Sequence, residues 1–146
     1  MIRVDEVRAR IEERVPALAG RIGTAGEFAR LVGANQLPQQ TPAAFVLPGA
    51  LAGGAATAGT GLFRQSFAEG VNVVLVVRVA GDATGARGVD EITPLIRAVV
   101  TAVVGWVPDG ALGTFVLGHG DLVGTEAGSL VYQLDFTLDD QLRIST

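Results

Sequence analysis

Apolar positions along the first part of the chain follow a helical period. Four of them fall on one face of a helix over 4–15, and charged residues occupy the other face. Pro16 ends or bends this helix, because proline lacks the backbone donor and clashes with the preceding turn. The apolar positions are Val4, Val7, Ile11 and Val15.

A second, shorter helix is predicted over 25–32. Thr24 is a candidate cap, and Glu27 follows it at the capping-box spacing. Gly33 and Asn35 provide the stop signals.

The clearest helical pattern lies over 92–104, where apolar residues recur without a miss. Pro94 fits the first turn, where a missing donor costs little, so Thr93 or Asp90 is the expected cap. The segment is rich in valine, a mediocre helix former, so packing on a sheet must stabilise it.

Strand patterns occupy the middle of the chain. A short buried strand is predicted over 43–47, closed by Pro48. Alternating apolar residues over 62–79 predict either one long bent strand or a hairpin, with Gly70 at the bend. The run 73–77 is apolar on both faces, which indicates a central strand.

The last third of the chain also has a strand pattern. Strands over 114–117 and 121–123 flank a predicted tight turn at Gly118-His119-Gly120. A second turn is expected over 126–128, before an alternating, half-buried strand over 130–138. The order of elements predicts one α+β domain spanning 1–146, with helices packed on one face of a mostly antiparallel or mixed sheet.

Between these strands, residues 49–61 carry no charge and no large aromatic side chain. They show no hydrophobic period either. We expect a flexible Gly/Ala loop, either disordered or ordered by a partner. Its glycines are candidate contacts with a neighbouring subunit or another assembly component: Gly53, Gly54, Gly59 and Gly61.

Composition favours assembly. Apolar residues make up 49% of the chain and mean hydropathy is +0.42, yet aromatics are only 5%. Part of this apolar surplus is expected on the surface, where it marks a partner interface in an obligate oligomer. The segment 98–107 is too short to span a membrane, which takes about 18 apolar residues, and the charged start lacks the apolar core of a signal peptide.

Charge argues against nucleic-acid binding. The net charge is −4, lysine is absent, and the arginines are scattered rather than clustered. Cysteine is absent too, so thiolate chemistry and disulfides are excluded.

No catalytic, metal or cofactor motif emerges. The Gly-rich stretch lacks the lysine of a phosphate loop, and His119 has no converging partners in the sequence, so it is expected in a solvent-exposed turn. The candidate functional residues are instead polar groups that interrupt the long strand: Arg64, Gln65, Glu69 and Arg78. Intersubunit pairing is one reason for their placement, and ordinary solvent-facing alternation is the other.

Four segments in succession carry a family resemblance. They are TPAAFVLP (41–48), GTGLFRQSFAEGVNVVLVVR (59–78), LIRAVVTAVVGWVPDG (95–110) and the closing VYQLDFTL (131–138). In this order the chain resembles phage tail terminator proteins, including those of Mu-like phages, over roughly residues 1–140. These motifs are structural rather than catalytic.

The resemblance implies a structural virion protein without cofactors. Such a protein assembles as a homo-oligomeric ring, typically a hexamer, on the head-proximal end of the tail tube in the host cytoplasm. It stops tube polymerisation and docks neck or head-completion proteins, while DNA passes through the lumen without specific binding. Loop 49–61 would then become ordered against a tube or neck subunit.

Two alternatives stay open from the sequence. Another head–tail connector or neck protein shares the size, acidity and ring assembly. A small-molecule-binding α+β domain, or an enzyme with a dispersed site, would instead need a pocket with converging polar groups.

Overall fold

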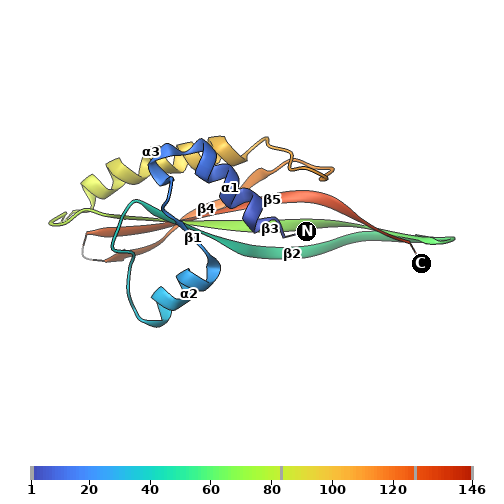
Figure 1. The fold of residues 1–146 in the computed structure, drawn as a ribbon, viewed down its shortest axis with the longest axis horizontal. Helices are drawn as coiled ribbons and strands as arrows, with labels where there is room; N and C mark the ends of the chain where they lie inside the picture. The colour runs from blue at the N-terminus through green and yellow to red at the C-terminus, as the bar shows by residue number, and fades with distance from the viewer. Residues whose placement is uncertain (1, 83, 127, 146) are drawn as a thin grey trace.

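A five-stranded sheet with the strand order β1-β2-β3-β5-β4 organises the chain (Figure 1). The structure, a computed structural model, describes residues 2–82, 84–126 and 128–145. Along the chain the elements are α1 (Val4–Arg14), the 3-10 turn η1 (Pro16–Leu18), β1 (Ile22–Gly23), α2 (Ala25–Gly33), β2 (Ala43–Gly59), β3 (Leu62–Arg78), α3 (Ala86–Val103), β4 (Val116–Glu126) and β5 (Ser129–Ser145).

The sheet is mixed and mostly antiparallel, which confirms the predicted fold class. Only β1 and β2 pair in parallel, whereas β2–β3, β3–β5 and β4–β5 are antiparallel. β3 is one unbroken strand at the centre, so the hairpin alternative for 62–79 is wrong. It pairs with β5 without a register shift, from Leu62 opposite Ser145 to Arg78 opposite Ser129.

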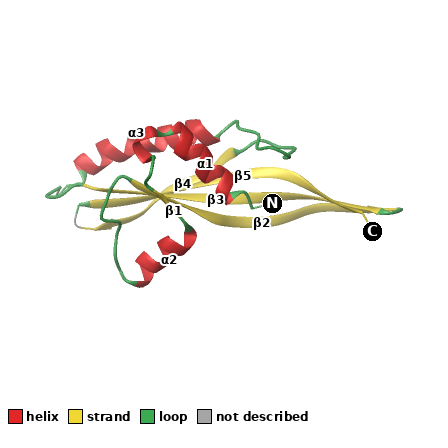
Figure 2. Cartoon of the chain, viewed as in Figure 1, coloured by secondary structure: helices red, strands yellow, loops and turns green. Residues whose placement is uncertain are grey.

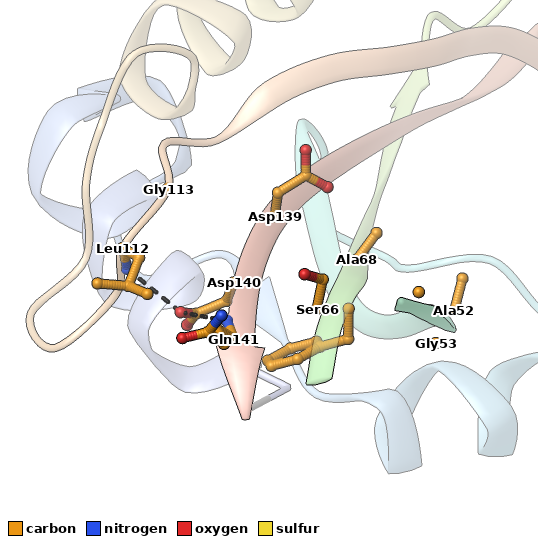
Figure 3. A pocket seen from close by; sticks show the side chains of 11 residues that line it. Ala52, Gly53, Ser66, Ala68, Leu112, Gly113, Asp139, Asp140 and Gln141 are labelled. Atoms are coloured by element: carbon orange, nitrogen blue, oxygen red, sulfur yellow. Dashed lines mark hydrogen bonds between the residues drawn. The ribbon is translucent and has the colours of Figure 1, made fainter. Parts of the chain in front are cut away.

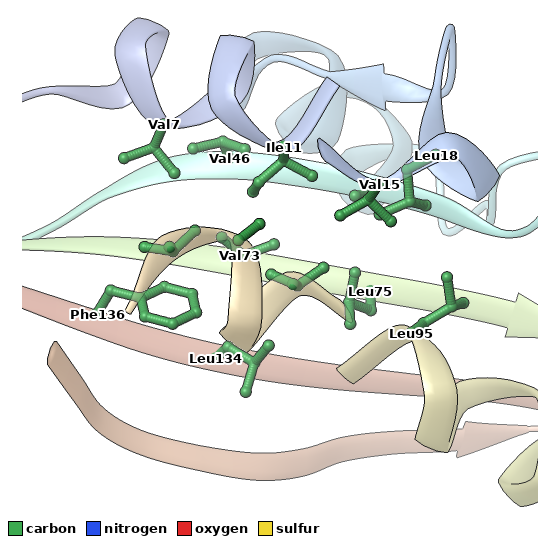
Figure 4. Packing of buried hydrophobic residues seen from close by; sticks show 14 of the residues in the cluster. Val7, Ile11, Val15, Leu18, Val46, Val73, Leu75, Leu95, Leu134 and Phe136 are labelled. Atoms are coloured by element: carbon green, nitrogen blue, oxygen red, sulfur yellow. The ribbon is translucent and has the colours of Figure 1, made fainter. Parts of the chain in front are cut away.

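Helices cover both faces of the sheet. α1 and α3 lie together on one face (Figure 2), where they enclose the main core with the inward side chains of β2, β3 and β5 (Figure 4). α2 packs on the opposite face against Phe45, Val74 and Val76. The expectation of helices on one face therefore holds for α1 and α3 but not for α2, because β3 presents valines to both faces.

The helix predictions for the N-terminal part are confirmed. α1 ends one residue before Val15, and η1 begins at Pro16. The Thr24 hydroxyl accepts a hydrogen bond from the backbone N–H of Glu27 at 3.2 Å, as the capping pattern predicted.

Residues 49–61 are not a loop. β2 continues through Pro48 to Gly59, and only Thr60 and Gly61 turn the chain into β3. Glycine and alanine are poor strand formers, which is why the sequence indicated a loop. Backbone pairing with β3 overrides that preference. The pairing shifts register twice along β2, at 48–51 and 53–56, where extra residues bulge out of the strand.

α3 begins at Ala86, six residues before the predicted start at Ile92, so Pro94 lies in its interior. Gly85, at φ +78°, is the N-cap residue, and the carboxylate of Asp82 accepts a hydrogen bond from the backbone N–H of Gly88 at 2.8 Å. This bond from a side chain three residues before the N-cap stabilises the start of the helix, so neither Thr93 nor Asp90 serves as the cap.

The predicted turn at Gly118-His119-Gly120 is also wrong. β4 runs straight through it, and His119 lies opposite Asp135 on β5. A register shift between Leu117 and His119 accommodates Gly118 in this edge strand, so the chain does not turn back there. In the second predicted turn Ala127 lies outside the described residues, and Gly128 has a φ of +85°. β5 confirms the strand over 130–138 and extends it to Ser145.

Candidate assembly surface

The ends of β2, β3 and β5 project beyond the helices as a three-stranded arm (Figure 1). We define the arm as residues 50–68 and 139–145. The β2–β3 turn at Thr60 and Gly61 forms its tip, and the C-terminal end of β5 lies beside that tip. Every residue of β2 from Ala50 to Gly59 is exposed, so the arm is open to a partner.

One face of the arm is mostly apolar, although Gln65 and Asp140 also lie on it and bond to backbone groups. It is the face that α1 and α3 cover over the rest of the sheet, but no helix reaches this far. Phe63 lies between Ala58 and Ile144 in register, so three apolar side chains cross the tip side by side. Leu51 and Ile144 are 51% and 48% exposed. These exposed apolar side chains make this face of the arm a candidate contact surface.

The opposite face of the arm is polar. Positions 64, 66 and 68 of β3 share this face with positions 143, 141 and 139 of β5. The side chains include two arginines, a serine, a glutamine and an aspartate. The arm is therefore amphipathic, with an apolar and a polar face on the same three strands.

A groove of about 620 Å³ lies at the base of the arm, beneath the loop that joins α3 to β4 (Figure 3). The backbone N–H of Leu112 donates to the Asp140 carboxylate at 3.3 Å, and the N–H of Gln141 donates to the same oxygen at 2.8 Å. Asp140 is thus engaged by the backbone. The groove is lined by Ala52, Gly53, Gly54, Ser66, Phe67, Ala68, Leu112, Gly113, Asp139, Asp140 and Gln141.

The groove lacks the groups that catalysis needs. Its remaining carboxylate, Asp139, is exposed and has no histidine or basic side chain among the lining residues. Across the described part of the chain, no three His, Cys, Asp or Glu side chains come together as a metal site. The groove is therefore a shape feature of the surface rather than a reaction centre.

The structure separates the sequence-predicted candidates. Arg64 is exposed on the polar face of the arm, and the Gln65 side chain donates to the Gly54 carbonyl at 3.3 Å. Arg78 ends β3 at the opposite end of the strand from the arm. Glu69 is 1% exposed and is used inside the chain, where it contacts Arg3.

The predicted glycines all lie on the arm. Gly53 and Gly54 line the groove that lies at the base of the arm. Gly59 is the last residue of β2, and Gly61 supplies the positive φ of +76° that the tip turn requires.

Three arm residues were missed by sequence reasoning: Leu142, Arg143 and Ile144. A signal for them existed, because the apolar alternation of β5 resumes at Leu142 and Ile144 after the interruption at Asp140. His119 is exposed on β4, with Asp121 as a neighbour at 4.0 Å. It is solvent-facing as expected, although on a strand.

Among the helices that the structure describes, none is both long and apolar enough to cross a membrane.

The fold class is an α+β sheet from which an amphipathic three-stranded arm projects. The model of the phage tail terminator protein family matches residues 1–146, and the chain belongs to that family. No curated protein is similar enough to the chain to count as a match. The chain is thus a tail-terminating structural component of a phage tail, acts with the tail tube, and is not an enzyme.

Proposed function

We propose that the chain forms a homo-oligomeric ring, most simply a hexamer, on the head-proximal end of the tail tube. The ring stops tube polymerisation and provides the docking surface for neck or head-completion proteins. The whole chain acts as one domain of the kind found in Mu-like phages. The observation that carries this proposal is the exposed apolar face of the arm.

The arm suits a ring for a geometric reason. A closed ring is built from head-to-tail contacts, in which one surface of a subunit meets a different surface of the next. A projecting arm supplies the first surface at a distance from the body of its own subunit. The side chains of Ala50, Ala52 and Ala58 on exposed β2 are small, so a neighbouring surface can approach the backbone of this strand closely. Gly53 and Gly54 instead give room to Gln65 and Ser66 of the same chain.

Charge supports passage of DNA through such a ring. The chain has a net charge of −4 and no lysine, so DNA phosphates find few cations to bind.

The proposed contact surface of the arm includes Gln65, Gly59 and Gly61. Arg78 at the far end of β3 is a candidate for the opposite contact.

The test removes the apolar face of the arm without touching the core. In the double variant Leu51→Asn/Ile144→Asn, both side chains are about half exposed, so the monomer should fold normally. We expect it to stay monomeric by native mass spectrometry and to fail to cap tail tubes. Phage carrying it should produce overlong tails.

The matched control is Val32→Asn/Val89→Asn, which removes two aliphatic side chains of similar exposure, 61% and 52%, from α2 and α3. This control should form rings like the wild type. Ring formation and normal tail length with the arm variant would contradict the proposal.

A further inference from the structure

Two arginines lie directly opposite each other near the tip of the arm. Arg64 on β3 and Arg143 on β5 are antiparallel partners, and both are exposed. The Arg143 Nε donates to the Gln141 side-chain oxygen at 2.8 Å. Neither guanidinium forms an ion pair with a carboxylate within residues 2–82, 84–126 and 128–145.

This arrangement costs stability in the isolated chain. Like charges directly opposite on neighbouring strands repel each other. The part of the arm beyond Asp139 and Asp140, residues 53–66 and 141–145, contains these two arginines and no acidic residue, so its net charge is +2. Because the net charge of the whole chain is −4, the rest of the chain has a net charge of −6. The basic end of the arm is therefore complementary in charge to the acidic body of another copy of the chain.

The body of the same sheet face offers an acidic counterpart. Asp121 on β4 lies opposite Gln133, and the next residue on this face of β5 is Asp135. The Asp121 side chain is 68% exposed, with His119 beside it at 4.0 Å. Gln133 donates to Asp135 at 2.9 Å, which holds that carboxylate in place on the sheet.

These acids cannot reach the arginines of their own chain. Asp135 and Arg143 are eight residues apart on one strand, or about 27 Å at the rise of an antiparallel strand. Side-chain contact between the two regions therefore requires two molecules. Asp139 is closer to Arg143, at four residues or about 14 Å, which is still beyond ion-pair distance.

We propose that the Arg64–Arg143 pair at the tip of one subunit binds the Asp121–Asp135 surface of a second copy of the chain. The inference rests on the proposed ring and names the charged groups that set its register. The two surfaces are different parts of the molecule, so they can pair head-to-tail and close a ring by rotation. A reciprocal two-fold dimer would use the same two surfaces, and it is told apart by its mass of two subunits. It is exposed, so salt weakens it.

Charge reversal tests the pairing in the full-length chain. Arg64→Glu/Arg143→Glu should weaken assembly at least about tenfold in subunit concentration, measured by mass photometry. Asp121→Arg should weaken it similarly. Mixing the two variants should restore assembly, because in an alternating ring each acidic tip meets a surface with the Asp121→Arg change and each basic tip meets an unchanged acidic surface. Combining all three changes in one chain should restore assembly in part, because Asp135 stays acidic beside the changed position.

Two controls match the changes in charge. Arg30→Glu/Arg97→Glu alters two exposed arginines on α2 and α3 by the same charge, and Asp90→Arg does so for an exposed aspartate on α3. Both should assemble like the wild type. Circular dichroism should show that every variant is folded.

The outcomes separate this inference from the proposed function. If the wild type neither forms rings nor caps tubes, the proposed function fails. If wild-type rings form and the double arginine variant assembles equally well, the inference fails while the ring stands. Loss of short duplex DNA binding with unchanged assembly would assign the arginine pair to phosphate and also overturn the inference.

Discussion

Arg3 and Glu69 meet where the arm leaves the body of the sheet, with 3.4 Å between the guanidinium Nε and the carboxylate Oε1. The other oxygen of Glu69 accepts from the backbone N–H of Ile2 at 2.5 Å. Arg3 also donates to the Asp109 carbonyl at 3.0 Å and lies 3.7 Å from Asp140. One arginine thus ties the N-terminal segment, the loop after α3 and the base of the arm together.

Removing the charge of Glu69 should destabilise the protein. The two side chains are 11% and 1% exposed, and in Glu69→Gln the guanidinium keeps Glu6 at 3.0 Å and Asp140 at 3.7 Å but loses its buried carboxylate partner. We expect the free energy of unfolding to fall by about 1–3 kcal/mol, measured by urea denaturation with Trp106 fluorescence. Glu13→Gln, at an exposed position of α1, should change it by less than about 0.5 kcal/mol. Equal effects of the two variants would contradict the role of the pair.

Gly113 should not tolerate a side chain. A Cβ at this position would lie 2.1 Å from the backbone oxygen of Asp139, so the loop must move away from β5. Gly113→Ala should lower the free energy of unfolding by about 1–3 kcal/mol. Gly33→Ala, at the end of α2 with open space around it, should be neutral or stabilising. A thermal melt that shows no difference between the two would refute the close approach.

Pro94 should be replaceable with a gain in stability. It lies in the interior of α3, is exposed, and deprives the helix of a backbone hydrogen bond. Pro94→Ala should raise the free energy of unfolding by about 1–3 kcal/mol, measured by chemical denaturation. Pro16→Ala at the first turn of η1 is the control, and no comparable gain is expected there. A loss of stability in Pro94→Ala would show that the proline is needed where it stands.

Phe115 should contribute more to stability than Phe63 of the arm. It is fully buried and stacks on Trp106, with ring centroids 5.7 Å apart. Phe115→Ala should cost about 3–5 kcal/mol and shift the tryptophan emission, so unfolding is best followed by circular dichroism. Phe63→Ala on the half-covered arm should cost clearly less. A larger loss at Phe63 would mean that the arm is part of the folding core.

Sequence patterns predicted the helices and strands in which buried apolar residues recur at a regular spacing. The helical period found α1 and the second half of α3, and the capping pattern found the start of α2 at Thr24. Strand alternation found β3 and most of β5. For the candidate site, the sequence identified Arg64 but not its partner Arg143, because strand register decides which residues face each other.

The sequence by itself determined the fold class, the central strand and the absence of recognisable catalytic motifs. Only the tertiary structure decided that residues 49–59 form a strand and that Glu69 pairs with Arg3 inside the chain. It also decided that α3, capped by Asp82, begins six residues before the predicted start. The physical reason is the range of the interactions. Periodic burial repeats among neighbouring residues, so the sequence shows it. Strand pairing and buried ion pairs join residues far apart along the chain, and the Asp82 cap lies outside the usual capping position, so no local pattern contains them.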